Sequence, residues 1–150
     1  MNHIELRFSA NLKNEALARV SIASFAALLD PTVEELLEIK TIVSEAVSNA
    51  IIHGYKMNAD RDVYIKAKII DRTIELEIQD YGVGIENLDE ILQNQYSVDM
   101  GNEHSGMGII IMKSLADYFD IHSTKGLGTR VVVRKTIESI VKKENETGVV

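Results

Sequence analysis

The chain has 150 residues, of which 45% are hydrophobic and 26% are charged, so it fits one globular domain with a sizeable core. Its 16 basic and 23 acidic residues give a net charge of −7, which argues against a nucleic-acid-binding surface. The absence of cysteine excludes disulfides, thiolate zinc sites and thiol catalysis. Because it has neither a signal peptide nor a membrane-length apolar run of ~18 residues, we expect a soluble, cytoplasmic protein without membrane contact.

Hydrophobic periodicity predicts a strand and then a helix at the start of the chain. Ile4, Leu6 and Phe8 alternate with polar residues, as in a half-buried strand. The Ala-rich stretch over 14–29 is typical of a helix. Pro31 ends it, because proline disfavours helical geometry in the residue before it.

A second, longer helix is predicted over roughly 33–54. Thr32 and Glu35 form a plausible capping box at its start, and Gly54 is a natural stop at its end. The residues of its broad apolar face are Leu36, Val43, Val47 and Ala50.

This second helix carries a polar stripe. Glu45, Asn49 and His53 recur every four residues and therefore lie on one side of the helix. Ile42 and Ile52 lie on nearly the same side, so the stripe is narrow and flanked by apolar residues. The pattern favours a helix that forms the wall of a cleft, although a solvated stripe with a capping histidine has the same spacing.

Beyond residue 60 the period changes from 3.6 to 2. Residues 63–69 and 74–78 alternate between apolar and polar, which predicts two antiparallel strands with one solvent-exposed face. The remaining predicted elements are a helical turn or two over 87–93, a mobile loop over 93–108, a helix over 109–119, a strand over 120–124 and a last strand over 129–136.

This order of elements predicts an α+β fold, a two-layer α/β sandwich with helices on one face of a mostly antiparallel, mixed sheet. We expect one domain over 1–137 and a frayed tail over 138–150.

Three glycine motifs lie next to predicted strands and helices. Asp80, Gly82 and Gly84 end a strand, where glycines let a ligand approach the backbone and the carboxylate suits an exocyclic amine such as that of adenine. The SGMG motif at 105–108 precedes a helix, whose free amides favour phosphate. Thr129 follows a turn glycine. Each motif alone also fits an ordinary turn or cap.

In this order, E-x-x-x-N-x-x-x-H, D-x-G-x-G, S-G-M-G and G-T-x-V resemble the N box and the three glycine boxes of the GHKL (Bergerat) ATP-binding superfamily, which includes gyrase, Hsp90, histidine kinases and MutL. Within it, VSEAVSNAIIHGY, DYGVGI and SGMGIIIM look most similar to the small anti-sigma-factor serine kinases of the sporulation anti-sigma F type. The resemblance covers about residues 4–136 and implies the fold of that superfamily.

The resemblance implies a role for each motif residue. Asn49 would coordinate the Mg²⁺ that bridges the phosphates of ATP or ADP. Glu45 would be the general base that takes the proton from an attacking serine hydroxyl. Asp80 would read the adenine amine, with Thr129 assisting.

The glycine motifs would bind the rest of the nucleotide. Gly82 and Gly84 would let the backbone approach it closely, and Ser105 would cap the helix that follows. The residues that would offer main-chain amides to the phosphates are Gly106, Met107 and Gly108.

The resemblance further implies an ATP-binding anti-sigma factor that sequesters a sigma factor of RNA polymerase and phosphorylates an anti-anti-sigma protein on serine. It also implies a homodimer. The sequence alone favours an ordinary surface role for Arg19. In this family, however, the first helix faces protein partners, so the resemblance makes Arg19 a candidate partner contact.

The chain departs from the family pattern before the SGMG motif. It has SVDMG at 97–101 and His104 where relatives carry a Thr-Thr-Lys-Pro-like stretch and an arginine. No Lys or Arg lies between Arg72 and Lys113, whereas 8 acidic residues do. Phosphoryl transfer needs charge neutralisation, to which one arginine finger contributes ~10³–10⁵ in rate. An alternative is therefore a nucleotide-binding anti-sigma module with weak or lost kinase activity. The detached catalytic domain of a histidine kinase is a less favoured reading, because no phosphoacceptor helix precedes the domain.

Overall fold

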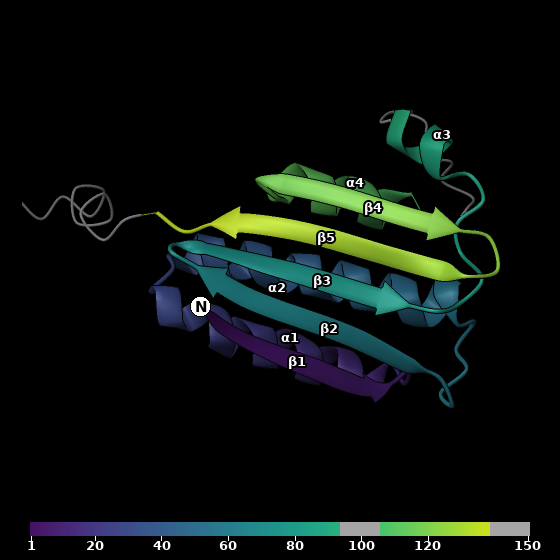
Figure 1. Ribbon diagram of the computed structural model, residues 1–150, viewed down its shortest axis with the longest axis horizontal. Coiled ribbons are helices and arrows are strands. Elements are labelled where there is room, and N and C mark those ends of the chain that lie inside the picture. The colour runs from purple at the N-terminus through teal and green to yellow at the C-terminus, as the bar shows by residue number, and fades with distance from the viewer. Residues whose placement is uncertain (94–105, 139–150) are drawn as a thin grey trace, which may run out of the picture.

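The computed structural model describes residues 1–93 and 106–138, which form a two-layer sandwich. Five strands make one sheet in the order β1-β2-β3-β5-β4, and α1, α2 and α4 cover one of its faces (Figure 1). All four pairs of neighbouring strands are antiparallel. The predicted α+β sandwich is confirmed. The described strands contain no parallel pair, so the sheet is antiparallel rather than mixed.

The strands are β1 (Asn2–Ser9), β2 (Asp62–Ile70), β3 (Thr73–Asp80), β4 (Tyr118–Thr124) and β5 (Gly128–Thr136). The helices are α1 (Lys13–Ala26), α2 (Val33–Ser48), α3 (Leu88–Gln93) and α4 (Met107–Leu115), with a 3-10 turn η1 (Ala27–Leu29) and a π-helix η2 (Asn49–Gly54). No helix in these ranges is long and apolar enough to cross a membrane.

Most elements lie where the periodicity placed them, but several of the predicted bounds are wrong. The helix predicted over 109–119 ends at Leu115, because Ala116 has an extended backbone and Tyr118 already begins β4. The loop predicted over 93–108 is wrong at both ends, because Gln93 belongs to α3 and Met107 and Gly108 belong to α4. Residues 94–105 of that loop and residues 139–150 of the predicted tail lie outside the described residues.

The core lies between the sheet and the helices. Ile65 of β2 opposes Ile78 of β3, and Ala67 opposes Leu76, so alternate residues of both strands share the inward face. The largest buried residues that α2 adds to this core are Ile39, Ile42, Val43 and Val47.

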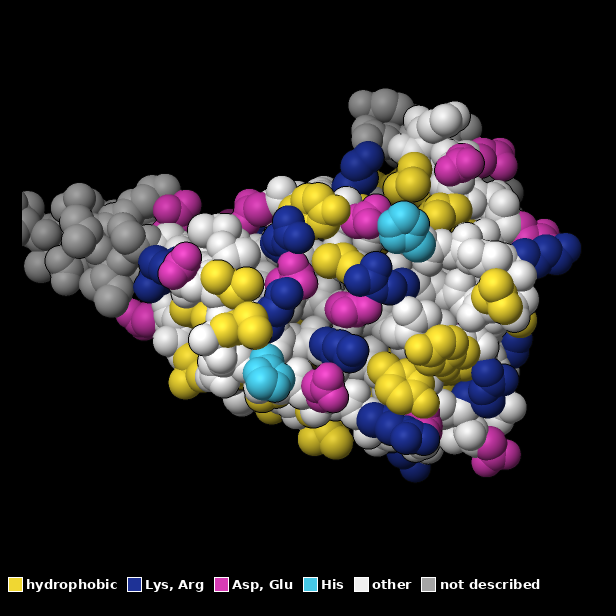
Figure 2. Space-filling model, in the orientation of Figure 1, with side chains coloured by type: hydrophobic (Ala, Val, Ile, Leu, Met, Phe, Trp, Pro, Cys, Tyr) yellow, Lys and Arg dark blue, Asp and Glu magenta, His cyan; other side chains and the backbone are white. Residues whose placement is uncertain are grey.

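The face of the sheet without helices is polar. Figure 2 shows Lys and Arg interspersed with Asp and Glu across it. Arg134 pairs with Glu75 at 2.7 Å, and Arg130 pairs with Glu77. Cross-strand ion pairs of this kind stabilise an exposed sheet face only modestly.

The two ends of the second helix differ in character. The capping box is confirmed: the Glu35 amide donates to Thr32 Oγ1 (3.0 Å), and the Thr32 amide donates to Glu35 Oε1 (2.9 Å). The predicted α-helix to Gly54 instead becomes π-helical from Asn49 onward. The Gly54 carbonyl accepts a hydrogen bond from the amide of Val83 (2.9 Å), which ties the segment after β3 to this helix end.

Candidate functional site

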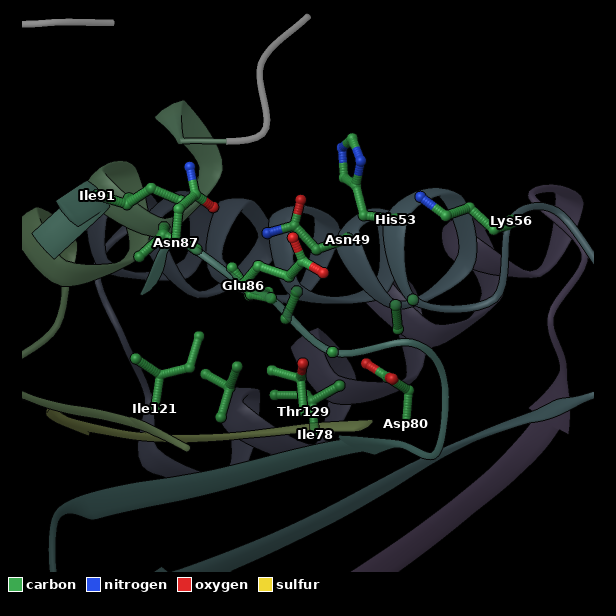
Figure 3. Close-up of a pocket in the computed structure, with 17 residues that line it drawn as sticks. Asn49, His53, Lys56, Ile78, Asp80, Glu86, Asn87, Ile91, Ile121 and Thr129 are labelled. Carbon is green, nitrogen blue, oxygen red and sulfur yellow. The ribbon is translucent and has the colours of Figure 1, made fainter. Parts of the chain in front are cut away.

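A cleft lies between the helix wall formed by α2 and η2 and the ends of β3 and β5 (Figure 3). Asn49 and His53 reach it from the helix wall, and Asp80 and Thr129 reach it from the sheet. Its main apolar lining residues are Ile78, Ile85, Ile109, Ile121 and Val131. The fold therefore brings polar groups that are distant in the sequence to opposite walls of one apolar cleft.

Asp80 is held firmly on the sheet wall and is only 4% exposed. Its Oδ1 accepts a hydrogen bond from the Gly82 amide (2.9 Å), and a Cβ added to Gly54 would lie only 2.7 Å from the same oxygen. Burial raises the pKa of Asp80 to about 6, although hydrogen bonds from the amides of Gly82 and Thr129 and the charge of Arg61 act in the opposite direction. This carboxyl group is a fixed hydrogen-bonding group that ionises close to neutral pH.

The raised pKa of Asp80 predicts a pH-dependent stability. Between its ordinary pKa of 3.8 and about 6, the folded chain keeps a proton that the unfolded chain has lost, so this group's contribution to stability falls as the pH rises. Asp80→Asn lacks that titration. The stability of the wild type relative to the variant is therefore expected to fall by about 2 kcal/mol from pH 4.5 to 7. Urea unfolding without ligand measures this difference, and parallel pH profiles would contradict it.

The glycines that follow Asp80 allow close contact between segments of the protein itself. A Cβ on Gly82 would collide with the Gly54 carbonyl, and a Cβ on Gly84 would collide with the Thr124 carbonyl. Gly84 also has φ +78 and lines the cleft. The role predicted for both glycines at a nucleotide stays a prediction, since their backbone freedom is already required by the fold.

The N-terminus of α4 lies against the polar stripe. Gly106 is its N-cap and Met107 is 38% exposed, whereas Ser105 lies outside the described residues. A Cβ on Gly108 would lie 2.6 Å from Glu45 Oε2 and 3.1 Å from Asn49 Nδ2. The first turn of α4 therefore lies next to the side chains of Glu45 and Asn49. This turn carries the free amides and the positive end of the helix dipole.

The surroundings of the stripe differ in part from the sequence prediction. Ile42 is fully buried, but Ile52 is 39% exposed, so isoleucines do not enclose the stripe on both sides. The π-helical turn has more residues per turn than an α-helix, so residues after Asn49 point in other directions than a continuous α-helix would give them. Glu45 is half-buried beside the cleft, and Asn49 and His53 line it.

Three polar cleft-lining residues were missed by sequence reasoning: Lys56, Glu86 and Asn87. Lys56 follows the helix stop and Glu86 follows the second glycine motif, so the flanks of the motifs were the available signal. Glu86 is paired with Lys125 at 2.9 Å.

Arg19 is not among the residues that line the cleft. It lies on α1, half-buried, with its guanidinium 3.6 Å from the Glu15 carboxylate. This ion pair is compatible with either a surface arginine or a partner contact.

Comparisons with known proteins show the family to which the chain belongs. Residues 8–135 match the histidine kinase-like ATPase domain family. The anti-sigma F factor of Shouchella clausii is 50% identical over 136 residues, which cover 91% of this chain and 93% of the relative. That of Clostridium perfringens is 44% identical over 138 residues, 92% of this chain and 99% of the relative. That of Bacillus thuringiensis is 46% identical over 138 residues, with 92% and 94% covered.

A solved structure of the RsbU and RsbW domains of a Mycobacterium tuberculosis protein shares the fold. The TM-score is 0.66 at 16% identity, with 91% of this chain and 32% of that chain covered. The family match spans most of the chain, and the relatives are similar over nearly their whole length. The chain therefore belongs to the histidine kinase-like ATPase family and, within it, to the anti-sigma F factors.

Proposed function

We propose that this protein is an ATP-binding anti-sigma factor that sequesters a sigma factor and phosphorylates an anti-anti-sigma protein on serine. The observation that carries this proposal is the meeting of Glu45, Asn49 and the first turn of α4 beside a cleft that also holds Asp80. Such a reaction needs a general base for the serine proton, a ligand for the metal ion, a site for the phosphates and a group that binds adenine.

The sheet wall is suited to adenine. The apolar lining accommodates an aromatic base, and the Asp80 carboxylate accepts a hydrogen bond from the exocyclic amine. Thr129 assists from the next strand, where its hydroxyl is 2.8 Å from Ser123 Oγ. The two polar groups therefore fix the orientation of the base from one side.

The helix wall is suited to the phosphates. The amides of Met107 and Gly108 open α4 and attract an anion. The side chains of Glu45 and Asn49 lie beside this turn, 2.6 Å (Oε2) and 3.1 Å (Nδ2) from the position that a Cβ on Gly108 would take. Asn49 would hold Mg²⁺ through its amide oxygen, an oxygen ligand of the kind this ion prefers; bound there, the ion would neutralise phosphate charge.

Glu45 acts as the general base in the proposed transfer. Its carboxylate takes the proton of the serine hydroxyl while the serine oxygen forms a bond to the γ-phosphorus. The bond from that phosphorus to the β–γ bridging oxygen breaks, and ADP leaves. The half-burial of Glu45 beside the α4 N-terminus supports this role, because the phosphate site is proposed at the same helix end.

A module without kinase activity is the second candidate. Among the described cleft-lining residues, Lys56 is the one Lys or Arg, and Asp80 and Glu86 are both acidic. Charge neutralisation would then depend on Mg²⁺ and the α4 amides, which suffice for binding more readily than for transfer.

The partners follow from the same proposal. The relatives' name implies a sigma factor as one partner and an anti-anti-sigma protein as the other. A role in sporulation and a homodimer as the acting form are proposed from the family resemblance. Arg19 on α1 is proposed as a partner contact.

Nucleotide binding is expected to raise the melting temperature of the protein. MgADP at ~100 Kd stabilises the folded state by about 2.7 kcal/mol. MgGDP is the matched control, because guanine presents a carbonyl where adenine presents its amine to Asp80. The absence of a shift at millimolar MgADP would contradict the whole proposal. Transfer of a labelled γ-phosphate to serine of the anti-anti-sigma protein then separates the kinase from the binding module.

A further inference from the structure

Arg61 lies just before β2, exposed and outside the cleft lining, yet it is bonded to the segment that carries Asp80. Its Nη2 donates to the Tyr81 carbonyl at 2.7 Å. Its guanidinium carbon lies 5.0 Å from the centroid of the Tyr55 ring, within the range of a cation–π contact. Arg61 is therefore held by two groups at once.

Tyr55 holds the same segment from the other side. It is 5% exposed, and its hydroxyl donates to the Asp62 carbonyl (2.6 Å) and accepts from the Tyr81 amide (2.8 Å). Both backbone polar groups of Tyr81 are thus bound, one by Tyr55 and the other by Arg61. Because Tyr81 directly follows Asp80 in the chain, these contacts restrict the position of the Asp80 carboxyl group.

The charge of Arg61 also acts on Asp80. Burial raises the pKa of Asp80, whereas Arg61 lowers it and so favours the ionised form. A carboxylate only accepts hydrogen bonds, whereas a protonated carboxyl group can donate one. The groups that share these surroundings with Asp80 are Arg61 and Tyr55, the cleft residues His53, Lys56 and Glu86, and the amides of Gly82 and Thr129.

The protonation state of Asp80 therefore selects between bases. Adenine presents an amine, which suits an acceptor, and hypoxanthine presents a carbonyl at the same ring position, which suits a donor. We propose that Arg61 is a positioning residue for the base preference of the cleft: its guanidinium anchors the backbone directly after Asp80 and brings a positive charge to the segment that carries this carboxyl group. This inference rests on the proposed nucleotide binding.

Calorimetric titration with MgADP and with MgIDP, the inosine diphosphate complex, tests the proposal. Arg61→Gln keeps an amide donor for the Tyr81 carbonyl but removes the charge. At pH 6.5 and low ionic strength it is expected to lower the ratio of ADP to IDP affinity about two- to fivefold, the size of one exposed opposite charge. The pH at which ADP affinity halves is expected to move upward, and the effect should shrink in high salt.

Two further variants serve as controls. Arg61→Lys keeps the charge and is expected to retain most of the wild-type ratio. Arg134→Gln removes a guanidinium that likewise lies over a tyrosine, 4.4 Å from the Tyr118 ring centroid, but on the open face of the sheet. It is expected to leave the ratio and the pH profile unchanged.

The other outcomes of the titration contradict either the role of Arg61 or the proposed function. A wild-type ratio in Arg61→Gln, or a parallel loss of ADP and IDP affinity without a shift of the pH profile, would overturn the assignment of base preference to Arg61. A wild type that binds neither nucleotide would instead refute the proposed function, so the two failures are distinguishable.

Discussion

Glu45→Ala is expected to lower phosphate transfer to serine by about 10²–10⁴, the usual contribution of a general base. MgADP affinity should be nearly unchanged, because Glu45 is proposed to act on the serine proton and not on the nucleotide. Single-turnover transfer of labelled phosphate, together with calorimetric MgADP binding, measures both quantities. Retained transfer would remove Glu45 as the base.

Two further variants distinguish the loss of the general base from a general disturbance of the site. Glu45→Gln preserves the shape of the side chain but cannot take a proton, so it should be as inactive as Glu45→Ala. Asn49→Ala should instead weaken the binding of the Mg-nucleotide complex itself, since it removes the proposed metal ligand. Equal effects of all three variants on binding would show that the stripe has a structural role only.

Gly108→Ala is expected to abolish most transfer activity without loss of stability. The added methyl would lie 2.6 Å from Glu45 Oε2 and 3.1 Å from Asn49 Nδ2, so both side chains must move away from the α4 N-terminus. A displaced base and metal ligand would lower transfer by about 10² or more, and MgATP binding would also weaken. Thermal unfolding should show equal or higher stability, because alanine is favoured over glycine in a helix by about 1 kcal/mol.

Gly106→Ala is the comparison for this variant. Among the residues that the structure describes, its Cβ would meet only the Ile91 side chain, at 3.7 Å, which is an ordinary contact, and its main-chain amide is retained. We expect a much smaller loss of transfer than for Gly108→Ala. Similar losses for both variants would indicate that glycine flexibility in α4, and not collision with Glu45, limits the reaction.

Local patterns were sufficient where the physics is local. Alternation placed β2 and β3, because successive strand residues face opposite sides, and the capping box of Thr32 and Glu35 placed the start of α2. The helix predicted to continue to residue 119 shows the limit of this reasoning. Apolar residues of a short helix and a short strand cannot be told apart where the two adjoin.

The sequence by itself determined the family, through the order and spacing of its four motifs, and named Asn49 and Asp80, which line the cleft. Only the tertiary structure decided how the motifs fit together: the π-helical turn at Asn49–Gly54, the seat of Gly82 on the Gly54 carbonyl, and the contacts of Arg61 and Tyr55 with Tyr81. These features depend on segments distant in the chain approaching each other, because close packing and hydrogen-bond satisfaction act between neighbours in space. Spacing along one chain does not encode which neighbours those will be.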